Sequence, residues 1–141
     1  MECPFCNSKS EIIFEEETVL GVFDKYPVTK FHALIIPKRH VSSFFELTSK
    51  EQHDCLIMLN NAQRMLSSWD SSISSFNVGI NDGRDAGQTI PHCHIHLIPR
   101  RLNDVKDPRG GIRHVIPNKG NYDDIVPINV LEEKLKLYPI N

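Results

Sequence analysis

The sequence has no hydrophobic run long enough to cross a membrane. Its 141 residues are 40% hydrophobic. The longest apolar runs, such as residues 33–37, are far shorter than the roughly 20 residues that a membrane-spanning helix needs. The opening residues, MECPFCNSKSE, lack the charged and then apolar pattern of a secretory signal peptide. These absences argue against a membrane protein and lead us to expect a cytoplasmic one.

An excess of positive charge is also missing. The 16 Lys and Arg residues are outnumbered by 18 Asp and Glu residues, which gives a net charge of −2. This balance offers no general basic surface for duplex nucleic acid, although a local site for phosphates is compatible with it. The sequence has no internal repeat, low-complexity segment or dividing linker. We therefore expect one domain over residues 1–141.

Cysteine is scarce, with four residues in the chain. A disulfide framework is not expected in a reducing cytosol. Cys3 and Cys6 form a C-x-x-C pattern, which is typical of either a redox pair or half of a zinc site. A redox pair normally caps a helix that follows a strand, and no strand can precede Cys3. We therefore favour zinc, and we expect Cys55 and Cys93 to fill the core.

Hydrophobic periodicity predicts an α+β fold with a mainly antiparallel sheet. Residues 17–23, 30–36, 76–80 and 88–98 are expected as strands because β-branched and aromatic residues are frequent in them. The T-x-x-E sequence at residues 48–51 is a capping box, and it opens an amphipathic helix that continues to residue 69. The remaining expectations are a short helix or turn at 41–47, a polar break at 71–75, a polar loop at 101–121 and a final helix at 127–137.

Three histidines occupy alternate positions in the run PHCHIHLIPR: His92, His94 and His96. Side chains alternate along a strand, so the three imidazoles should share one face, while residues 93, 95 and 97 face the core. Burying three imidazoles without partners is costly, which favours a functional site over a purely structural role. The outer two are about 13 Å apart on a straight strand, too far to share one metal. We therefore expect the three to divide their duties.

The residues before the histidines are suited to an anion. Glycines in the segments 81–83 and 87–89 let backbone N–H groups approach a phosphate, and Asn, Gln and Thr add neutral donors. The same glycines also fit a hairpin turn. Imidazole is a good nucleophile for phosphorus near neutral pH when its other nitrogen is held by an acceptor.

Residues 92–98 resemble the H-φ-H-φ-H-φ-φ signature of the histidine-triad (HIT) family of nucleotide hydrolases and transferases. The resemblance runs from about residue 19 to residue 100, and it includes DGRDAGQT at 82–89 and HALIIPK at 32–38. It implies a homodimer of domains with a five-stranded antiparallel sheet and one long helix. Within the chain it implies an N-terminal tail at about 1–10, a catalytic core at about 11–100, and a loop and C-terminal segment at 101–141.

The resemblance also implies roles for individual residues. His94 matches the nucleophile that forms a covalent nucleotidyl-histidine. His96 matches the residue that contacts the α-phosphate, and His32 matches a relay residue behind the triad. His32 follows Phe31, where many members have glycine. The positions that match substrate contacts or support the triad are Asp24 for the ribose, and Asn81, Gly87, Gln88, Thr89 and His92 around the phosphates.

In the zinc-containing branch of the family, a C-x-x-C pair joins two histidines. The matching residues here are Cys3, Cys6, His40 and His92. Two thiolates and two imidazoles suit a tetrahedral structural zinc, since four protein ligands leave no open position. The resemblance implies no organic cofactor, and Mg²⁺ can arrive with the substrate.

The expected activity is hydrolysis of dinucleoside polyphosphates or related nucleotide conjugates at the α-phosphate. This expectation rests on residues 107–113 and 115–117, which resemble microbial HIT proteins described as diadenosine tetraphosphate hydrolases. A nucleoside phosphoramidase and a nucleotidyl transferase or phosphorylase stay open. So does a zinc-stabilised nucleotide-binding protein without catalysis. In the Arg109-Gly110-Gly111 loop, Arg109 either reaches a polyphosphate or anchors the loop, and the same two roles are open for Arg113.

Overall fold

The computed structural model describes residues 2–7, 12–125 and 127. The strands β1 (Ile12–Glu15), β2 (Val19–Phe23), β3 (Ala33–Pro37), β4 (Ile73–Ile80) and β5 (Ile95–Arg101) form one antiparallel sheet in the order β1-β2-β3-β5-β4. One long helix occurs within the described residues: α1 (Ser49–Trp69), which lies between β3 and β4 in the chain. This architecture confirms the predicted α+β fold with five antiparallel strands and one long helix.

The start of α1 is fixed by the capping box. The Thr48 hydroxyl accepts the Glu51 N–H at 3.1 Å, and the Glu51 carboxylate accepts the Thr48 N–H at 2.9 Å. Arg39 donates to the same carboxylate at 2.8 Å. This hydrogen bond and the positive charge of Arg39 hold the pKa of Glu51 below its usual value. The segment after β3, which carries His40, is therefore tied to the first turn of the helix.

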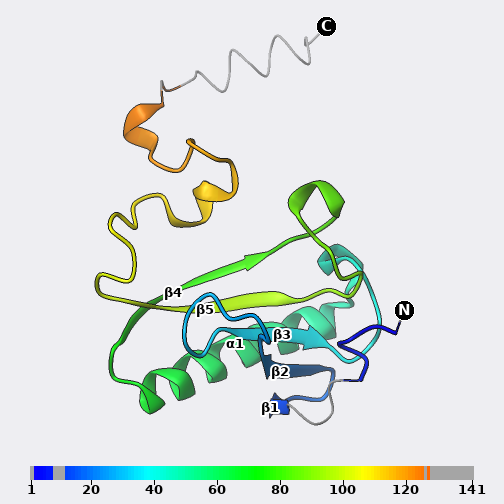
Figure 1. Cartoon of the computed structure of the whole chain (residues 1–141). Coiled ribbons are helices and arrows are strands. Elements are labelled where there is room, and N and C mark those ends of the chain that lie inside the picture. Colours follow the sequence, from blue (N-terminus) through cyan, green and yellow to red (C-terminus); the bar gives the residue numbers. More distant parts are fainter. Residues whose placement is uncertain (1, 8–11, 126, 128–141) are drawn as a thin grey trace, which may run out of the picture. The chain divides into compact units, whose positions relative to one another are not determined.

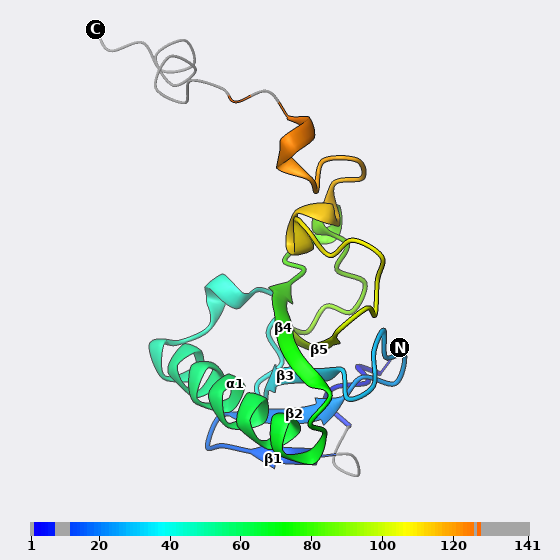
Figure 2. The ribbon, with the colours of Figure 1, turned by 90° about the vertical axis from the view of Figure 1, so that its left-hand side faces the viewer.

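The helix covers one face of the sheet, and the N-terminal segment lies on the other (Figures 1 and 2). Residues 93, 95 and 97 pack into the core on the helix side, as their alternation with the histidines predicts. On the opposite face, Phe5 packs against a smaller apolar group. The larger core includes Ala33, Ile35, Cys55, Met58, Ala62, Leu66, Cys93, Ile95 and Leu97, and the smaller one consists of Val22, Leu34 and Ile36.

Three expected strand starts were wrong, and one strand was missed. Strand β3 begins at Ala33 and not at residue 30, because the chain turns there: the His32 N–H donates to the Thr29 carbonyl at 3.1 Å. Strand β5 begins at Ile95, so His92 and His94 precede it, because their segment turns: the N–H of His92 donates to Ile90 and that of Cys93 to Val41. Strand β4 begins at Ile73, inside the expected polar break, because its partner β5 extends to Arg101. The periodicity also missed β1, a short edge strand with an irregular register. Residues 128–137 of the expected final helix lie outside the described residues.

Two compact units divide the chain, residues 1–105 and residues 106–141. The described part of the second unit contains two 3-10 turns, η4 (Gly111–Val115) and η5 (Tyr122–Asp124). Arg109 forms ion pairs of 3.0 Å with both Asp107 and Asp123, and Arg113 donates to the Gly120 carbonyl at 2.9 Å. These contacts fit the loop-anchoring role of the two arginines. The single domain over residues 1–141 stays a prediction.

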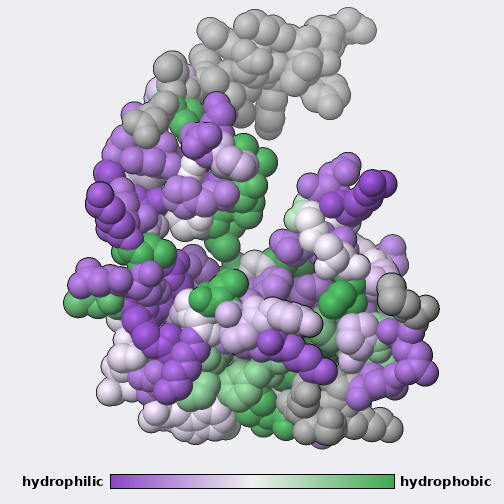
Figure 3. Space-filling model, viewed as in Figure 1, coloured by the Kyte–Doolittle hydropathy of each residue, from purple (hydrophilic) through white to green (hydrophobic). Residues whose placement is uncertain are grey.

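Hydrophobic residues form small patches among hydrophilic ones on the face of the molecule shown in Figure 3. Among the residues that the structure describes, no helix is both long enough and apolar enough to span a membrane.

Candidate active site and metal centre

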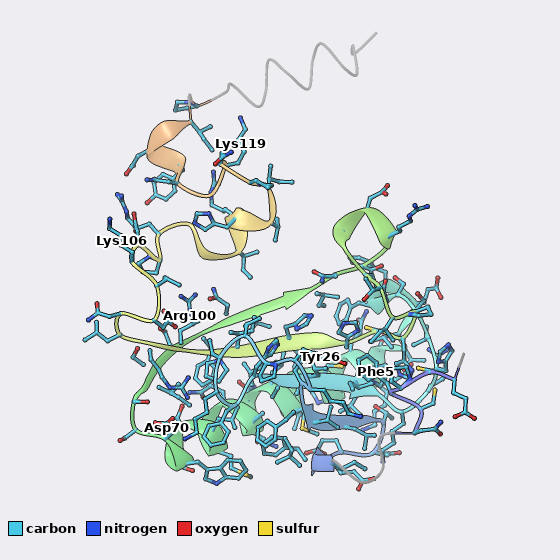
Figure 4. All side chains as sticks on the ribbon, in the orientation of Figure 1. Phe5, Tyr26, Asp70, Arg100, Lys106 and Lys119 are labelled. Atoms are coloured by element: carbon cyan, nitrogen blue, oxygen red, sulfur yellow. The ribbon has the colours of Figure 1, made fainter. Side chains whose placement is uncertain are left out.

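A cleft of about 610 Å³ opens on the face of the sheet that α1 leaves uncovered. Figure 4 shows two of its aromatic residues, Phe5 and Tyr26, on this face. Four parts of the chain meet there: the N-terminal segment, β2 and β3 with their connection, the loop after β4, and the start of β5. The lining residues are Pro4, Phe5, Val22, Phe23, Asp24, Lys25, Tyr26, Val28, His32, Leu34, Asn81, Gly87, Thr89, Ile90, His94 and His96.

His94 is oriented as a nucleophile. Its Nδ1 lies 2.8 Å from the carbonyl oxygen of His92, and a carbonyl can only accept a hydrogen bond. Nδ1 therefore carries the proton, and Nε2 keeps a free lone pair. The side chain is 8% exposed and lines the cleft. This is the tautomer that attack on phosphorus requires.

His32 and His96 form a hydrogen-bonded relay beside His94. The N–H of Val28 donates to Nδ1 of His32 at 3.2 Å, so the proton of His32 is on Nε2. This Nε2 donates to Nδ1 of His96 at 2.9 Å. The remaining nitrogen of His96, Nε2, therefore carries its proton and is a donor.

Burial keeps the relay neutral. Desolvation lowers the pKa of His96 to about 4, with smaller contributions in the same direction from His94 and His32. It also lowers the pKa of His32, although the carboxylate of Asp24, 3.6 Å from Nε2, opposes the shift. Asp24 itself lines the cleft and accepts the N–H of Tyr26 at 2.8 Å. At neutral pH, His96 therefore offers a hydrogen bond and not a full positive charge.

The expected phosphate loop divides into residues that reach the cleft and residues that shape the loop. Asn81, Gly87 and Thr89 line the cleft. The side chain of Gln88 instead accepts the Gly83 N–H at 2.8 Å and donates to the carbonyls of two neighbouring segments. The φ angles of Gly83 and Gly87, 94° and 92°, lie in a region that favours glycine.

The second expected group, Cys3, Cys6, His40 and His92, comes together beside Pro4 and Phe5 of the cleft lining. Their ligand atoms all lie within 4.8 Å of one another. His92 donates from Nε2 to the Pro37 carbonyl at 2.8 Å, so its Nδ1 faces the group with a free lone pair. His92 is fully buried and belongs to this group, and it is not among the residues that line the cleft.

The donor set and spacing fit tetrahedral zinc. The two Nδ1 atoms of His40 and His92 are 3.1 Å apart, and sulfur–nitrogen distances are 3.4 Å from Cys3 to His92 and 3.3 Å from Cys6 to His40. Zinc bonds of about 2.0–2.1 Å to nitrogen and 2.3 Å to sulfur give tetrahedral edges of about 3.3 Å and 3.6 Å. The four residues are therefore arranged to hold the ion with little movement.

Asp24, His32 and His96 also bring their ligand atoms within 4.8 Å of one another. Their hydrogen bonds argue against a metal there. Nε2 of His32 carries the proton because its Nδ1 accepts the Val28 N–H, so it has no lone pair to offer. We interpret this group as a proton-bearing relay.

Sequence reasoning missed the role of Phe5, and it noted Phe31 only as a departure from the family pattern. Phe31 has φ of 70°, in the left-handed region that favours glycine. Its ring compensates by stacking on Phe23 at 5.6 Å and meeting Trp69 at 6.0 Å. Phe5 lies 5.0 Å from the ring of His94. Its place between two cysteines that could bind a metal was the signal that could have located it.

The family comparison agrees with this geometry. Residues 6–103 match the family described as "HIT domain". The chain belongs to the HIT family. Its relatives include the nitrilase and fragile histidine triad fusion protein NitFhit of Caenorhabditis elegans, 43% identical over 81 residues, which cover 57% of this chain and 18% of that one.

Two further HIT relatives match more of their own length. The asymmetrical bis(5'-nucleosyl)-tetraphosphatase of Schizosaccharomyces pombe is 32% identical over 112 residues, which cover 79% of this chain and 61% of that protein. A Zn-bound histidine triad family protein from Mycobacterium smegmatis has a TM-score of 0.66 and 31% identity, covering 74% of this chain and 78% of that one. The chain thus spans less than two thirds of the two curated relatives.

Proposed function

We propose that this HIT protein hydrolyses dinucleoside polyphosphates at the α-phosphate through a nucleotide covalently bound to His94. The observation that carries the proposal is the tautomer of His94. Its Nδ1 is held by the His92 carbonyl at 2.8 Å, so Nε2 is free beside the donor nitrogen of His96. The tetraphosphatase among the relatives supports the substrate class.

The lining of the cleft gives each part of such a substrate a partner. Apolar side chains of Phe5, Val22 and Leu34 suit a nucleobase, and Asp24 can accept hydrogen bonds from the ribose hydroxyls. The α-phosphate then lies at His94 and His96. The remaining phosphates extend toward three neutral residues of the loop, Asn81, Gly87 and Thr89.

The reaction proceeds in two displacements. In the first, Nε2 of His94 bonds to the α-phosphorus, and the bond to the bridging oxygen breaks, with its electron pair leaving on the polyphosphate. The His92 carbonyl stabilises the positive charge that appears on the His94 ring, and the Nε2–H of His96 donates to the phosphate. In the second, water attacks phosphorus, the P–N bond breaks and returns its pair to Nε2, and the water proton passes to solvent.

Cys3, Cys6, His40 and His92 would hold a structural zinc ion. When bound, the ion supplies a cross-link between the N-terminal segment and the residues before β5, and no Lewis-acid chemistry, because all four positions are taken by protein. Metal analysis of the purified protein should give about one zinc per chain. Protein without zinc after growth in zinc-supplemented medium would contradict this part of the proposal.

We also place the active protein in the cytoplasm as a homodimer. Strand β4 is a sheet edge, and exposed apolar residues of β4 and α1, such as Val78, Leu56 and Trp69, suit a two-fold interface. Light scattering should give twice the 16.1 kDa mass of the chain. A single-chain mass at micromolar concentration would count against the dimer.

The substrate is tested with a panel of dinucleoside polyphosphates, nucleoside phosphoramidates and nucleotide sugars, each with and without added phosphate. We expect a nucleoside monophosphate and the complementary nucleotide from the polyphosphates, at rates that do not depend on added phosphate. Faster turnover of phosphoramidates would indicate a phosphoramidase, and phosphate-dependent turnover would indicate a phosphorylase. Binding without turnover of any substrate would leave a nucleotide-binding protein.

A further inference from the structure

The two residues between the metal-binding cysteines belong to the wall of the substrate cleft. Pro4 and Phe5 line the cleft, while Cys3 and Cys6 on either side belong to the group Cys3, Cys6, His40 and His92, which we call the metal group. We call residues 3–6 the N-terminal knuckle. Its Cys6 N–H donates to the Cys3 carbonyl at 3.2 Å, so the knuckle is a single tight turn. One turn thus presents its sulfur atoms to the metal and its apolar side chains to the cleft.

Phe5 connects the two sites directly. Its ring centroid is 5.0 Å from that of His94 and 5.9 Å from that of His92, and the ring packs on the apolar group formed by Val22, Leu34 and Ile36. The ring therefore packs against both His94, the proposed nucleophile, and His92, a proposed metal ligand. Displacing the knuckle would remove a wall of the cleft and would uncover the imidazole of His94.

His92 is a second connection. Its Nδ1 faces the cysteines, and its Nε2 donates to the Pro37 carbonyl. Its own backbone carbonyl accepts a hydrogen bond from Nδ1 of His94. A metal ion on Nδ1 would fix the ring of His92. The carbonyl that orients the His94 ring belongs to the same residue. The metal group and the nucleophile are thus joined through packing and through the chain.

We propose that metal binding and nucleotide binding are thermodynamically coupled through the knuckle. Zinc organises the turn against the sheet before the nucleotide arrives, so the nucleotide no longer has to order it. Because coupling is reciprocal, the nucleotide must raise the affinity for zinc by the same factor by which zinc raises the affinity for the nucleotide. This inference rests on the proposed function, because it requires a nucleotide in the cleft.

The experiment measures both sides of the cycle on the full chain. Calorimetry gives the affinity for the four common nucleoside monophosphates, the expected products, with zinc-loaded and zinc-free protein. Competition with a chromophoric chelator gives the affinity for zinc with and without the nucleotide that binds best. We expect both ratios to agree and to be about 10-fold, within the range of about 5- to 150-fold that coupled sites commonly show.

Phe5→Ala is the deciding variant, because it keeps all four metal ligands and removes the ring between the two sites. It should still bind about one zinc per chain, and its coupling factor should fall toward 1. Phe5→Leu, which retains part of the apolar contact, should be intermediate and serves if the alanine variant does not fold. Phe45→Ala is the matched control, because it removes an exposed phenylalanine outside both sites and should leave the coupling unchanged.

The outcomes separate this inference from the proposed function. If no form binds a nucleotide, the proposed function fails and the coupling falls with it. Equal nucleotide affinity with and without zinc overturns the coupling alone, and so does a protein that binds nucleotide but no zinc. Coupling that persists in Phe5→Ala would also overturn the proposal, since the knuckle would not carry it.

Discussion

Two pairs of facing imidazoles lie in the same unit, and their hydrogen bonds give them opposite chemistry. In the metal group, the Nδ1 atoms of His40 and His92 are 3.1 Å apart. In the relay, Nε2 of His32 and Nδ1 of His96 are 2.9 Å apart. The distances are nearly equal, so distance alone cannot distinguish a metal site from a hydrogen bond.

The difference comes from the partner of the far nitrogen. His92 donates its one proton to the Pro37 carbonyl, which leaves a lone pair facing His40 and the two thiols. His32 accepts the Val28 N–H, which leaves a proton facing His96. When one ring nitrogen donates to an acceptor, the other nitrogen keeps a lone pair and can bind a metal. When one ring nitrogen accepts a hydrogen bond, the other carries the proton and is a donor. His94 resembles His92 in this respect, because its Nδ1 donates to a carbonyl and its Nε2 keeps a lone pair. In the proposed reaction that lone pair attacks phosphorus.

Removing the imidazole between the two pairs should have the largest effect. His94→Ala and His94→Asn remove the proposed nucleophile and leave Asp24 and the cleft walls, the proposed nucleotide contacts, in place. We expect kcat to fall by at least about 10⁴-fold, with a much smaller change in nucleotide affinity. Steady-state turnover and calorimetry measure the two quantities.

A rapid-quench experiment with radiolabelled dinucleotide tests the intermediate itself. Wild-type protein should carry a label that is stable in base and lost in acid, as a phosphoramidate is, and His94→Ala should carry none. Near wild-type turnover by His94→Ala would refute the nucleophile assignment. Turnover without any label in the wild type would indicate direct attack by water.

The relay should contribute less than the nucleophile. His96→Ala removes the donor to the phosphate, and we expect kcat to fall by about 10²- to 10⁴-fold. His32→Ala should lower kcat by a smaller factor, because it acts through His96, and His32→Gln, which keeps a donor, should recover part of the loss. A kcat of His32→Ala above that of the wild type would show that the relay does not orient His96.

The metal group should matter for stability more than for chemistry. Replacing both cysteines, Cys3→Ser with Cys6→Ser, should abolish zinc binding and lower the melting temperature. A ligand at 1,000 times its Kd stabilises the folded state by about 4 kcal/mol, which sets the scale of the loss. Cys55→Ser, which alters a buried thiol outside the group, should keep its zinc and therefore controls the zinc measurement. An unchanged zinc content in the double variant would rule out these ligands.

The smallest effect concerns pH. Because burial lowers the pKa of His96 from its ordinary value of 6.5 to about 4, the unfolded chain binds a proton that the folded chain does not between these values. Stability is therefore full above about pH 6.5 and falls as the pH drops toward 4, by at most about 1.4 kcal/mol per pH unit from this residue. Denaturant unfolding of wild type and His96→Gln over this range should show a shallower slope for the variant. Parallel curves would mean that His96 is not held neutral by the fold.

Much of this arrangement could be predicted from the sequence. The capping box at Thr48 and Glu51 and the three- and four-residue spacing fixed α1, because both signals are local. The alternation at residues 92–97 correctly separated the core residues 93, 95 and 97 from the three histidines, of which His94 and His96 line the cleft. The four candidate zinc ligands followed from the family resemblance, and the structure brings them together.

The division of labour among the histidines was decided by tertiary structure. His40 and His92 are 52 residues apart, and His32 and His96 are 64 apart, so their meeting depends on the pairing of β3 with β5. The carbonyl of Pro37 and the N–H of Val28, which set the two tautomers, leave no pattern in the sequence. Tertiary contacts also placed Phe31 in a left-handed conformation, because its ring gains Phe23 and Trp69 as neighbours. Local patterns and the family resemblance identified which residues would take part, and only the closure of distant segments determined which nitrogen of each ring was left free.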